Sequence, residues 1–272
     1  MLGGISLKLF GRNYDRPGPG VKKDEPRKKG VARFFEVLLR DFFDLVKLNV
    51  VFCGCILPAV AAFLLGSFGF YSAFAYLLSL VLSFPVGGAA SAYAFCVTKM
   101  LRDDPGFIWA DFKRKFRENL KQAAVPGILC TAIIEAQVMM WAPFFLGETD
   151  LGLVWIVIMF TVLLIFAMIS PYIFVLFAYV DLKMFQTIRN GILLSLANAP
   201  RSAAGAFSGC VLWILFVLFL PYSFVFLPLI ALFGFSLSWL LCLMWVWPPI
   251  DKQFAIEDTL KARRDADGES AQ

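Results

Sequence analysis

The stretch KMLRDDPGFIWADFKRKFRENLKQ, residues 99–122, is the longest polar interruption in an otherwise apolar chain. Seven of its residues are Lys or Arg. Charge is absent from residues 48–98, 151–180 and 202–250, and each of these segments exceeds the roughly 20 residues that a membrane-spanning helix needs. Backbone polar groups in hydrocarbon must pair within their own segment, so these segments predict transmembrane helices.

The composition predicts the same fold class. Hydrophobic residues make up 60% of the chain and charged residues 17%, against about 45–50% and about 25% in soluble proteins. The apolar runs are too continuous for the alternating strands of a β-barrel. We therefore predict an all-α, polytopic membrane protein. The first apolar run begins only near Leu48, so we expect no signal peptide, and the first span should stay in the mature protein.

The hydropathy pattern divides the chain into three parts. Residues 1–30 are a leader whose prolines and glycines prevent a regular helix, and it is either flexible or docked on the protein's own cytoplasmic face. Residues 31–250 form a six-helix membrane domain, and residues 251–272 form a polar cytoplasmic tail. The predicted spans are residues 48–66, 72–97, 123–145, 151–180, 203–220 and 224–247, with the last turn at residues 221–223.

Positive charge predicts the orientation of these spans. All 25 Lys and Arg residues lie before the first span, in the central stretch, in residues 181–201 or in the tail, and the three opposite turns contain none. The positive-inside rule therefore places both termini in the cytoplasm. The net charge of +5 follows from this topology, and no nucleic-acid partner is needed to explain it.

Amphipathic helices are predicted at the cytoplasmic interface for residues 31–47, 111–121 and 181–201, because their apolar residues recur every three or four positions. In the first segment, we expect the aromatic face to meet the headgroup boundary or other helices. Its basic residues, such as Arg33 and Arg40, should then meet anionic lipid.

A threefold internal plan is visible in the chain. Each of three units has an amphipathic aromatic segment, then a basic residue near an amide side chain, and then a helical hairpin. The basic and amide residues are Lys47 with Asn49, Lys121 with Asn119 and Gln122, and Arg201 with Asn198. Duplicated hairpins would produce this plan, and so would ordinary topology, because spans that enter from the cytoplasm tend to begin with a positive charge.

Three further features concern packing inside the spans. The run PVGGAASA at residues 85–92 permits a bend and the close approach of another helix, and the alternative is a substrate-binding break. Trp245 and Trp247 are expected to mark the exit of the last span, as interfacial aromatic residues do. The six cysteines all fall in apolar runs and the chain has no histidine, so we expect packing roles for them instead of metal or redox chemistry.

Glu135 is the one ionisable residue placed well inside a predicted span. A charge at the bilayer centre costs about 2.5–3.5 kcal/mol on insertion scales, so this side chain must face protein or water, or be protonated. It is either a carboxylate that couples proton or cation movement, or a neutral acid hydrogen-bonded between helices. Gln137 lies off the helix face of Glu135, so we expect no joint site.

The central stretch resembles the loop signature of the YesL-like family of bacterial integral membrane proteins, in residues Arg102, Asp103, Asp104, Trp109, Asp111, Phe112, Phe116, Asn119 and Gln122. Residues 14–21 and 23–26 are similar to the leader of many members, and residues 85–92 match their small-residue second span. The last two spans agree only in hydropathy. The resemblance implies a bacterial plasma membrane location and an accessory role beside an ABC-type carbohydrate uptake complex. It implies no catalytic residues, and the function of the family is undefined.

Three roles are open for the residues of this signature. Arg102, Asp103 and Asp111 could form an intramolecular network of salt bridges and helix caps. They could also belong to a docking surface for a partner, or to a small-ligand site.

Catalysis is not expected. Intramembrane proteolysis needs two facing acids, a Ser or Cys with a His, or a metal motif, and one buried acid in a chain without histidine supplies none of these. We predict no cofactor and no metal. Two functions are left: a non-catalytic scaffold or accessory factor, or a small transporter or channel that uses Glu135.

Overall fold

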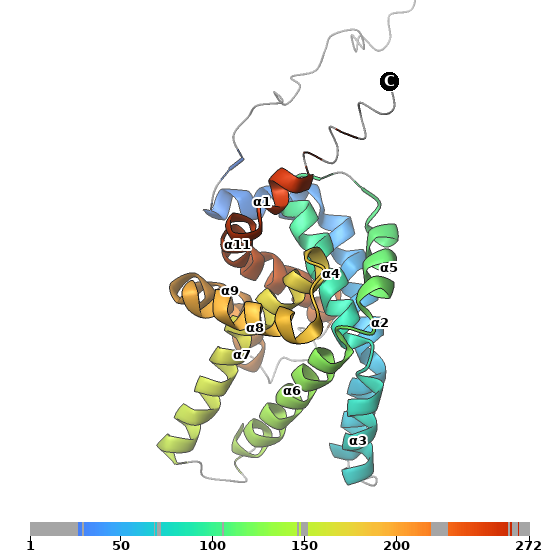
Figure 1. The fold of residues 1–272 in the computed structure, drawn as a ribbon. Helices are drawn as coiled ribbons and strands as arrows, with labels where there is room; N and C mark the ends of the chain where they lie inside the picture. The colour runs from blue at the N-terminus through green and yellow to red at the C-terminus, as the bar shows by residue number, and fades with distance from the viewer. Residues whose placement is uncertain are drawn as a thin grey trace, which may run out of the picture.

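The computed structural model describes residues 27–28, 30–67, 69, 72–104, 106–145, 147, 152–218 and 228–260, with residues 262 and 266. Every regular element in these parts of the chain is helical (Figure 1). The elements are α1 (Gly30–Arg40), α2 (Phe42–Ser67), α3 (Ser72–Leu82), α4 (Val86–Leu101), α5 (Ile108–Asn119), α6 (Ala124–Phe145), α7 (Leu153–Tyr179), α8 (Met184–Ala197), α9 (Ala199–Leu218), the π-helix η2 (Ile230–Gly234) and α11 (Phe235–Phe254). Residues 1–26 of the predicted leader and the predicted turn at residues 221–223 lie outside the described residues.

Four helices are long and apolar enough to cross a membrane: α2, most of α6 (Ala124–Phe144), α7, and Leu232–Phe254. Helices α3 and α4 make a fifth if they are taken as one span with a bend of 43°. Pro85 lies at this bend, where its ring removes a backbone donor. The all-helical fold with four or five candidate spans is therefore confirmed. Helix α9, which covers most of the fifth predicted span, is not among the candidates found in the described residues.

Two helix boundaries differ from the prediction. The segment at residues 31–47 is divided at Asp41, and α2 then runs without interruption from Phe42 into the apolar segment. Helix α4 continues through Lys99 to Leu101, so the polar interruption begins at Arg102. Lys99 can stay in the helix because its charge meets a carboxylate on α5, as described below.

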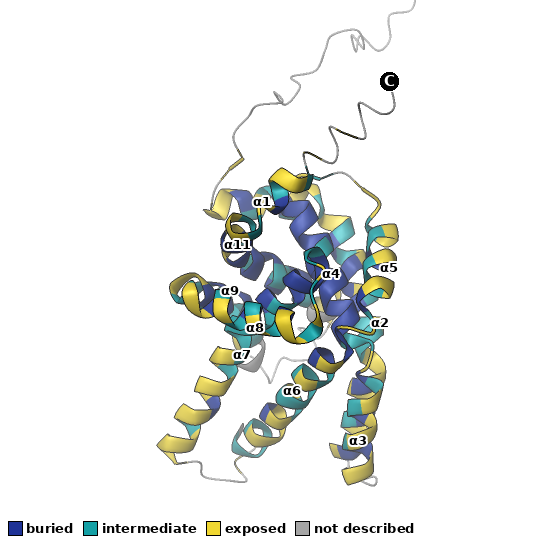
Figure 2. Cartoon of the chain, viewed as in Figure 1, coloured by how far each residue is buried: buried dark blue, intermediate teal, exposed yellow. Residues whose placement is uncertain are grey.

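The core lies where α4, the second half of α7 and α11 meet. Each of these three helices contacts the other two, and buried residues concentrate on them (Figure 2). The largest side chains that are fully buried there include Tyr93, Tyr172, Leu176, Leu240 and Leu243. The centre of the described helices is therefore filled by aromatic and aliphatic side chains.

The threefold plan has a counterpart in the packing. Each unit contains a short helix, a long helix and a returning helix: α1, α2 and α3–α4; then α5, α6 and α7; then α8, α9 and η2–α11. The short helix of each unit packs against the returning helix of the unit before it, as α5 does on α4 and α8 does on α7. Helix α1 closes the ring by packing on α11.

Small residues allow two helices to cross closely at residues 85–92. A Cβ atom added at Gly87 would lie 1.8 Å from the carbonyl oxygen of Ala123, and one added at Gly127 would lie 2.3 Å from the amide nitrogen of Gly87. The interpretation of this run as a packing feature is therefore confirmed. It is the point where α6 crosses α4.

Candidate functional site

The last turn of α4 is held by arginine side chains from the segment that precedes α2. Helix C-termini leave their last carbonyl groups without partners inside the helix. Three consecutive carbonyl oxygens accept hydrogen bonds from guanidinium groups here: Met100 from Arg40 (2.7 Å), Leu101 from Arg33 (2.6 Å) and Arg102 from Arg27 (2.9 Å). The helix dipole also favours positive charge at this end.

The carboxylate of Asp103 binds the same three arginines. It accepts a hydrogen bond from Arg33 at 2.7 Å, lies 3.4 Å from the Nε of Arg27, and pairs with Arg40. Burial by itself would raise the pKa of Asp103, but the hydrogen bonds from Arg33 and Arg40 outweigh it and hold the pKa below its usual value. We call Asp103, Arg27, Arg33 and Arg40 the Asp103 cluster.

Asp103 occupies a backbone position that usually takes glycine. Its φ of 58° is left-handed, a conformation that costs residues other than glycine about 1–3 kcal/mol. The N–H of Asp103 donates to the carbonyl of Met100 at 3.2 Å and that of Asp104 donates to Lys99 at 3.1 Å, which are the two bonds of a Schellman C-cap. The arginine contacts explain why an aspartate stands at this turn position.

A second ion pair joins α4 to α5. Lys99 is nearly buried, and its Nζ lies 2.5 Å from Asp111 Oδ2. Arg114 binds the other oxygen of the same carboxylate at 3.0 Å. A Cβ atom at Gly106 would lie 2.0 Å from Lys99 Nζ, so a side chain there would displace the lysine from its present position.

Arg102 points inward and joins α4 to the two other central helices. Only 7% of the residue is exposed. Its guanidinium group stacks on the rings of Tyr179 and Trp247, 5.1 and 5.2 Å from their centroids, and donates to the hydroxyl of Tyr179 at 3.0 Å. An ion pair to Asp104 at 3.5 Å partly neutralises the buried charge. This arginine is part of the core and is not accessible to a partner.

Trp247 does not face outward as an interfacial aromatic residue would. This residue is buried against Arg102 and Tyr179, whose ring centroid lies 5.2 Å away. Helix α11 continues past it to Phe254. Trp245, on another face of the same helix, is about half exposed.

The prediction for the basic face of the first amphipathic helix is wrong. Arg33 and Arg40 turn toward the α4 terminus, where they bind carbonyl oxygens and Asp103. The apolar residues Val31, Phe35 and Leu39 of α1 point outward and are exposed. The inward side of α1 combines Arg33 with apolar residues, because Val37 is fully buried and Phe34 and Leu38 pack against the core.

The remaining residues of the central signature divide into buried and exposed ones. Phe112 is buried and stacks on Phe116, with ring centroids 6.1 Å apart. Asn119 is also buried, and its Nδ2 has no hydrogen-bond partner in the described part of the chain. Trp109 and Gln122 are exposed. The structure therefore does not bring all the signature residues together into one site.

Glu135 lies on α6 and its carboxylate accepts a hydrogen bond from the hydroxyl of Ser79 on α3. Gln137 has a different partner, since its side-chain oxygen accepts a hydrogen bond from Trp141 Nε1 at 3.0 Å. As expected, Glu135 and Gln137 do not form a joint site.

The sequence did not single out a buried polar cluster that joins α2, α4 and α11. The hydroxyls of Tyr93 and Ser236 lie 2.6 Å apart, Asn49 Oδ1 accepts from the backbone N–H of Ser236 at 3.0 Å, and Ser236 donates to the carbonyl of Leu45 at 2.6 Å. Only the isolated serines in an uncharged segment could have signalled it.

No protein-family model matches the sequence, and searches of curated proteins and of solved structures found no significant match. The resemblance of the central stretch to the YesL-like family therefore stays a prediction.

Proposed function

We propose that this chain is a non-catalytic scaffold or accessory factor of the bacterial plasma membrane, with six spans and both termini in the cytoplasm. The charge pattern supports this orientation, because the turns opposite the basic segments contain no Lys or Arg. Residues 202–250 carry no charge over 49 positions, which is about 74 Å of helix and enough for two crossings. On this proposal α9 and α11 supply the fifth and sixth spans, and α1 lies in the cytoplasmic interface.

The packed centre is the observation that carries the scaffold proposal. A solute pathway needs polar groups along its length, whereas α4, α7 and α11 meet through fully buried residues such as Val97, Val175 and Leu243. The buried hydroxyls of Tyr93 and Ser236 in this region are bonded to each other.

The α1 end of the molecule offers a surface for a partner. Val31, Phe35 and Leu39 form an exposed apolar stripe on α1, and the contacts of Arg33 and Arg40 hold that stripe outward. Exposed apolar stripes of this kind dock partner helices or meet lipid. The family resemblance suggests an ABC-type carbohydrate uptake complex as the partner.

Crosslinking in the native membrane tests this proposal. The tagged full chain should co-purify with another membrane complex after mild crosslinking, and a Phe35→Ala/Leu39→Ala variant should lose that complex. The matched control is Phe160→Ala/Leu164→Ala, which truncates exposed residues of α7 far from α1 and should keep it. Recovery of the lone chain from the native membrane would contradict the scaffold proposal.

The contact between Glu135 and Ser79 supports one alternative, a small transporter or channel. A carboxylate bonded across two candidate spans is a candidate proton or cation site. Protein in liposomes would then carry a proton or cation flux that Glu135→Gln abolishes. Flux that is unchanged in this variant would remove the carboxylate from the mechanism.

A further inference from the structure

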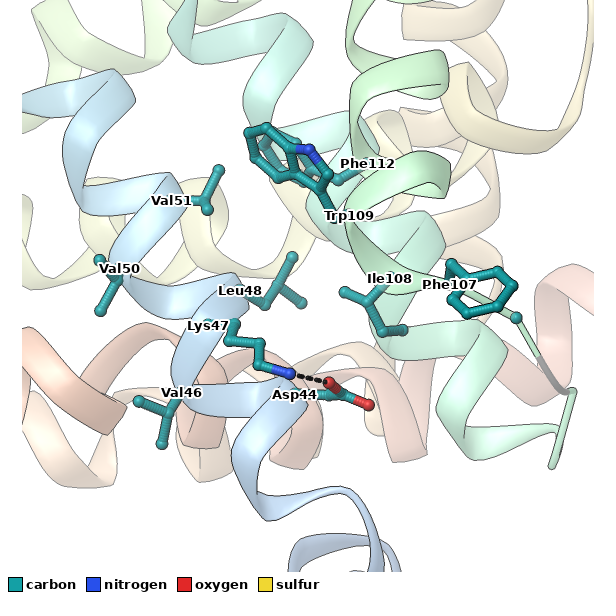
Figure 3. A pocket seen from close by; sticks show the side chains of 11 residues that line it. Asp44, Val46, Lys47, Leu48, Val50, Val51, Phe107, Ile108, Trp109 and Phe112 are labelled. Atoms are coloured by element: carbon teal, nitrogen blue, oxygen red, sulfur yellow. Dashed lines mark hydrogen bonds and ion pairs between the residues drawn. The ribbon is translucent and has the colours of Figure 1, made fainter.

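A groove of about 520 Å³ lies between the start of α2 and the start of α5 (Figure 3). One wall is formed by Val46, Leu48, Val50 and Val51 of α2, and the other by Phe107, Ile108, Trp109 and Phe112. Asp44 and Lys47 line it with their side chains on the α2 side. A volume of this size lies within the range of about 300–1,000 Å³ that small-molecule sites occupy.

The walls of the groove expose large apolar side chains. Phe107 is 86% exposed, Trp109 63% and Val50 51%. Covering such side chains removes apolar surface from water, which is favourable. An apolar occupant of the groove would supply that cover.

The groove straddles the boundary between polar and apolar sequence. Lys47 is the last charged residue before the uncharged residues 48–98, and Val50 and Val51 belong to the helix that continues into this apolar segment. Trp109 faces it with an indole ring, the side chain that is enriched at the level of lipid headgroups. A molecule with a polar head and an apolar chain fits this arrangement.

Unpaired positive charge lies along α5, past the groove. Lys113 and Arg117 follow Trp109 on α5 at four-residue intervals, and Lys121 lies in the turn after the helix. All three are exposed, and none of them makes an ion pair with another residue that the structure describes. We call these three residues the basic stripe. It favours a negatively charged headgroup, since each Lys or Arg near an anionic surface contributes about 1 kcal/mol.

Lys47 can contact that headgroup directly. Among the described residues it pairs with Asp44, three positions earlier, at 3.2 Å, and its side chain is 71% exposed. An exposed pair of this kind contributes little to stability. Lys47 is therefore available to a phosphate at the edge of the groove.

We propose that this groove is a binding site for one anionic glycerophospholipid of the cytoplasmic leaflet, with an acyl chain between α2 and α5 and the phosphate at Lys47. The site rests on the orientation given under the proposed function. On this proposal, α2 and α5 contact the anionic lipid. The basic residues of α1, for which the sequence predicted that contact, bind the end of α4 instead.

Quenching of Trp109 by brominated lipid tests the site. The full chain is placed in phosphatidylcholine nanodiscs doped with either brominated phosphatidylglycerol or brominated phosphatidylcholine of the same chain length. The Trp109 signal is the difference between the natural chain and Trp109→Phe. We expect phosphatidylglycerol to quench it at a several-fold lower mole fraction than phosphatidylcholine, and Lys47→Gln to weaken the effect about fivefold.

A matched pair of variants separates the groove from ordinary lipid contact. Val50→Phe fills the groove and should abolish the preference, whereas Val60→Phe, two to three turns further along the exposed face of α2, should keep it. Equal quenching by the two lipids, or no quenching, would overturn the proposal. The proposal would also be overturned if Trp109 were quenched only after deletion of residues 1–26, because the leader would then occupy the groove in the full chain.

The orientation is measured separately, with a reporter of cytoplasmic location fused after Gln272. If the reporter is cytoplasmic and the two lipids quench Trp109 equally, only the proposal of a lipid site is wrong. If the reporter is outside the cell, the proposed orientation is wrong, and both proposals that rest on it are wrong too.

Discussion

The α1 end of the molecule and its opposite end use similar helices but are stabilised in different ways. At the α1 end, the charges of Asp103, Lys99 and Arg102 are partly or fully buried and each has a partner. At the opposite end, α3, α6 and the first half of α7 project from the body with their apolar faces exposed (Figures 1 and 2). Specific polar contacts therefore hold one end, while lipid must cover the other.

This difference predicts where substitutions will be tolerated. Residues at the helix crossings and in the Asp103 cluster are fixed by geometry, whereas residues on the projecting helices meet fluid hydrocarbon. Four experiments test this difference, and the substitution expected to do most damage comes first.

Gly87→Val should have the largest effect. The added Cβ would lie 1.8 Å from the Ala123 carbonyl oxygen, which is backbone and cannot move aside, so we expect loss of folded protein from detergent extracts. Gly54→Ala is the control, because an added Cβ there meets nothing within 4 Å. A normal yield of monodisperse Gly87→Val would show that α4 and α6 do not cross this closely.

Leu243→Ala and Leu164→Ala form a matched pair for the core and the projecting end. Leu243 is fully buried, so its truncation should lower the free energy of unfolding by about 2–4 kcal/mol. Leu164 is 46% exposed and should change it by less than about 0.5 kcal/mol. Denaturation by SDS in mixed micelles measures the free energy of unfolding of both variants. If the two variants lose similar amounts of stability, α7 is covered by protein along its whole length.

Asp103→Asn should destabilise the α1 end by about 2 kcal/mol. The amide keeps the left-handed backbone conformation but leaves the buried Arg33 with only Glu36 as an acidic partner among the described residues. Asp44→Asn breaks an exposed pair and should cost less than about 1 kcal/mol. Thermal unfolding followed by tryptophan fluorescence compares the two variants, and equal shifts would contradict the role of the cluster.

Acid should weaken the same cluster. The pKa of Asp103 is lower in the folded protein than in the unfolded chain, so its contribution to stability is present above the unfolded pKa of about 3.9 and is lost as pH falls through the folded value. The natural chain should therefore lose more stability than Asp103→Asn below about pH 4. Parallel pH profiles of the two proteins would show that Asp103 does not carry this dependence.

The projecting end was easier to predict from sequence than the α1 end. Hydropathy predicted the apolar segments of α2, α6 and α7, and the run at residues 85–92 predicted the close helix crossing. For α1 the pattern located the helix and its two faces but did not reveal the partners of its basic residues. The distant partners of Arg33 and Arg40 lie 60 or more positions away, at residues 100–103, and helical periodicity carries no information at that separation.

From its sequence alone, this chain is recognisable as helical, apolar along most of its length and basic in the polar segments that separate its uncharged runs. Those properties are local, since they depend on the solvent that each residue prefers and on the spacing of residues along one helix. The burial of Arg102 with Trp247, the three arginines at the end of α4 and the groove between α2 and α5 are visible only in the folded molecule. Each of them depends on contacts between helices distant in sequence, which the local preferences of a residue do not specify.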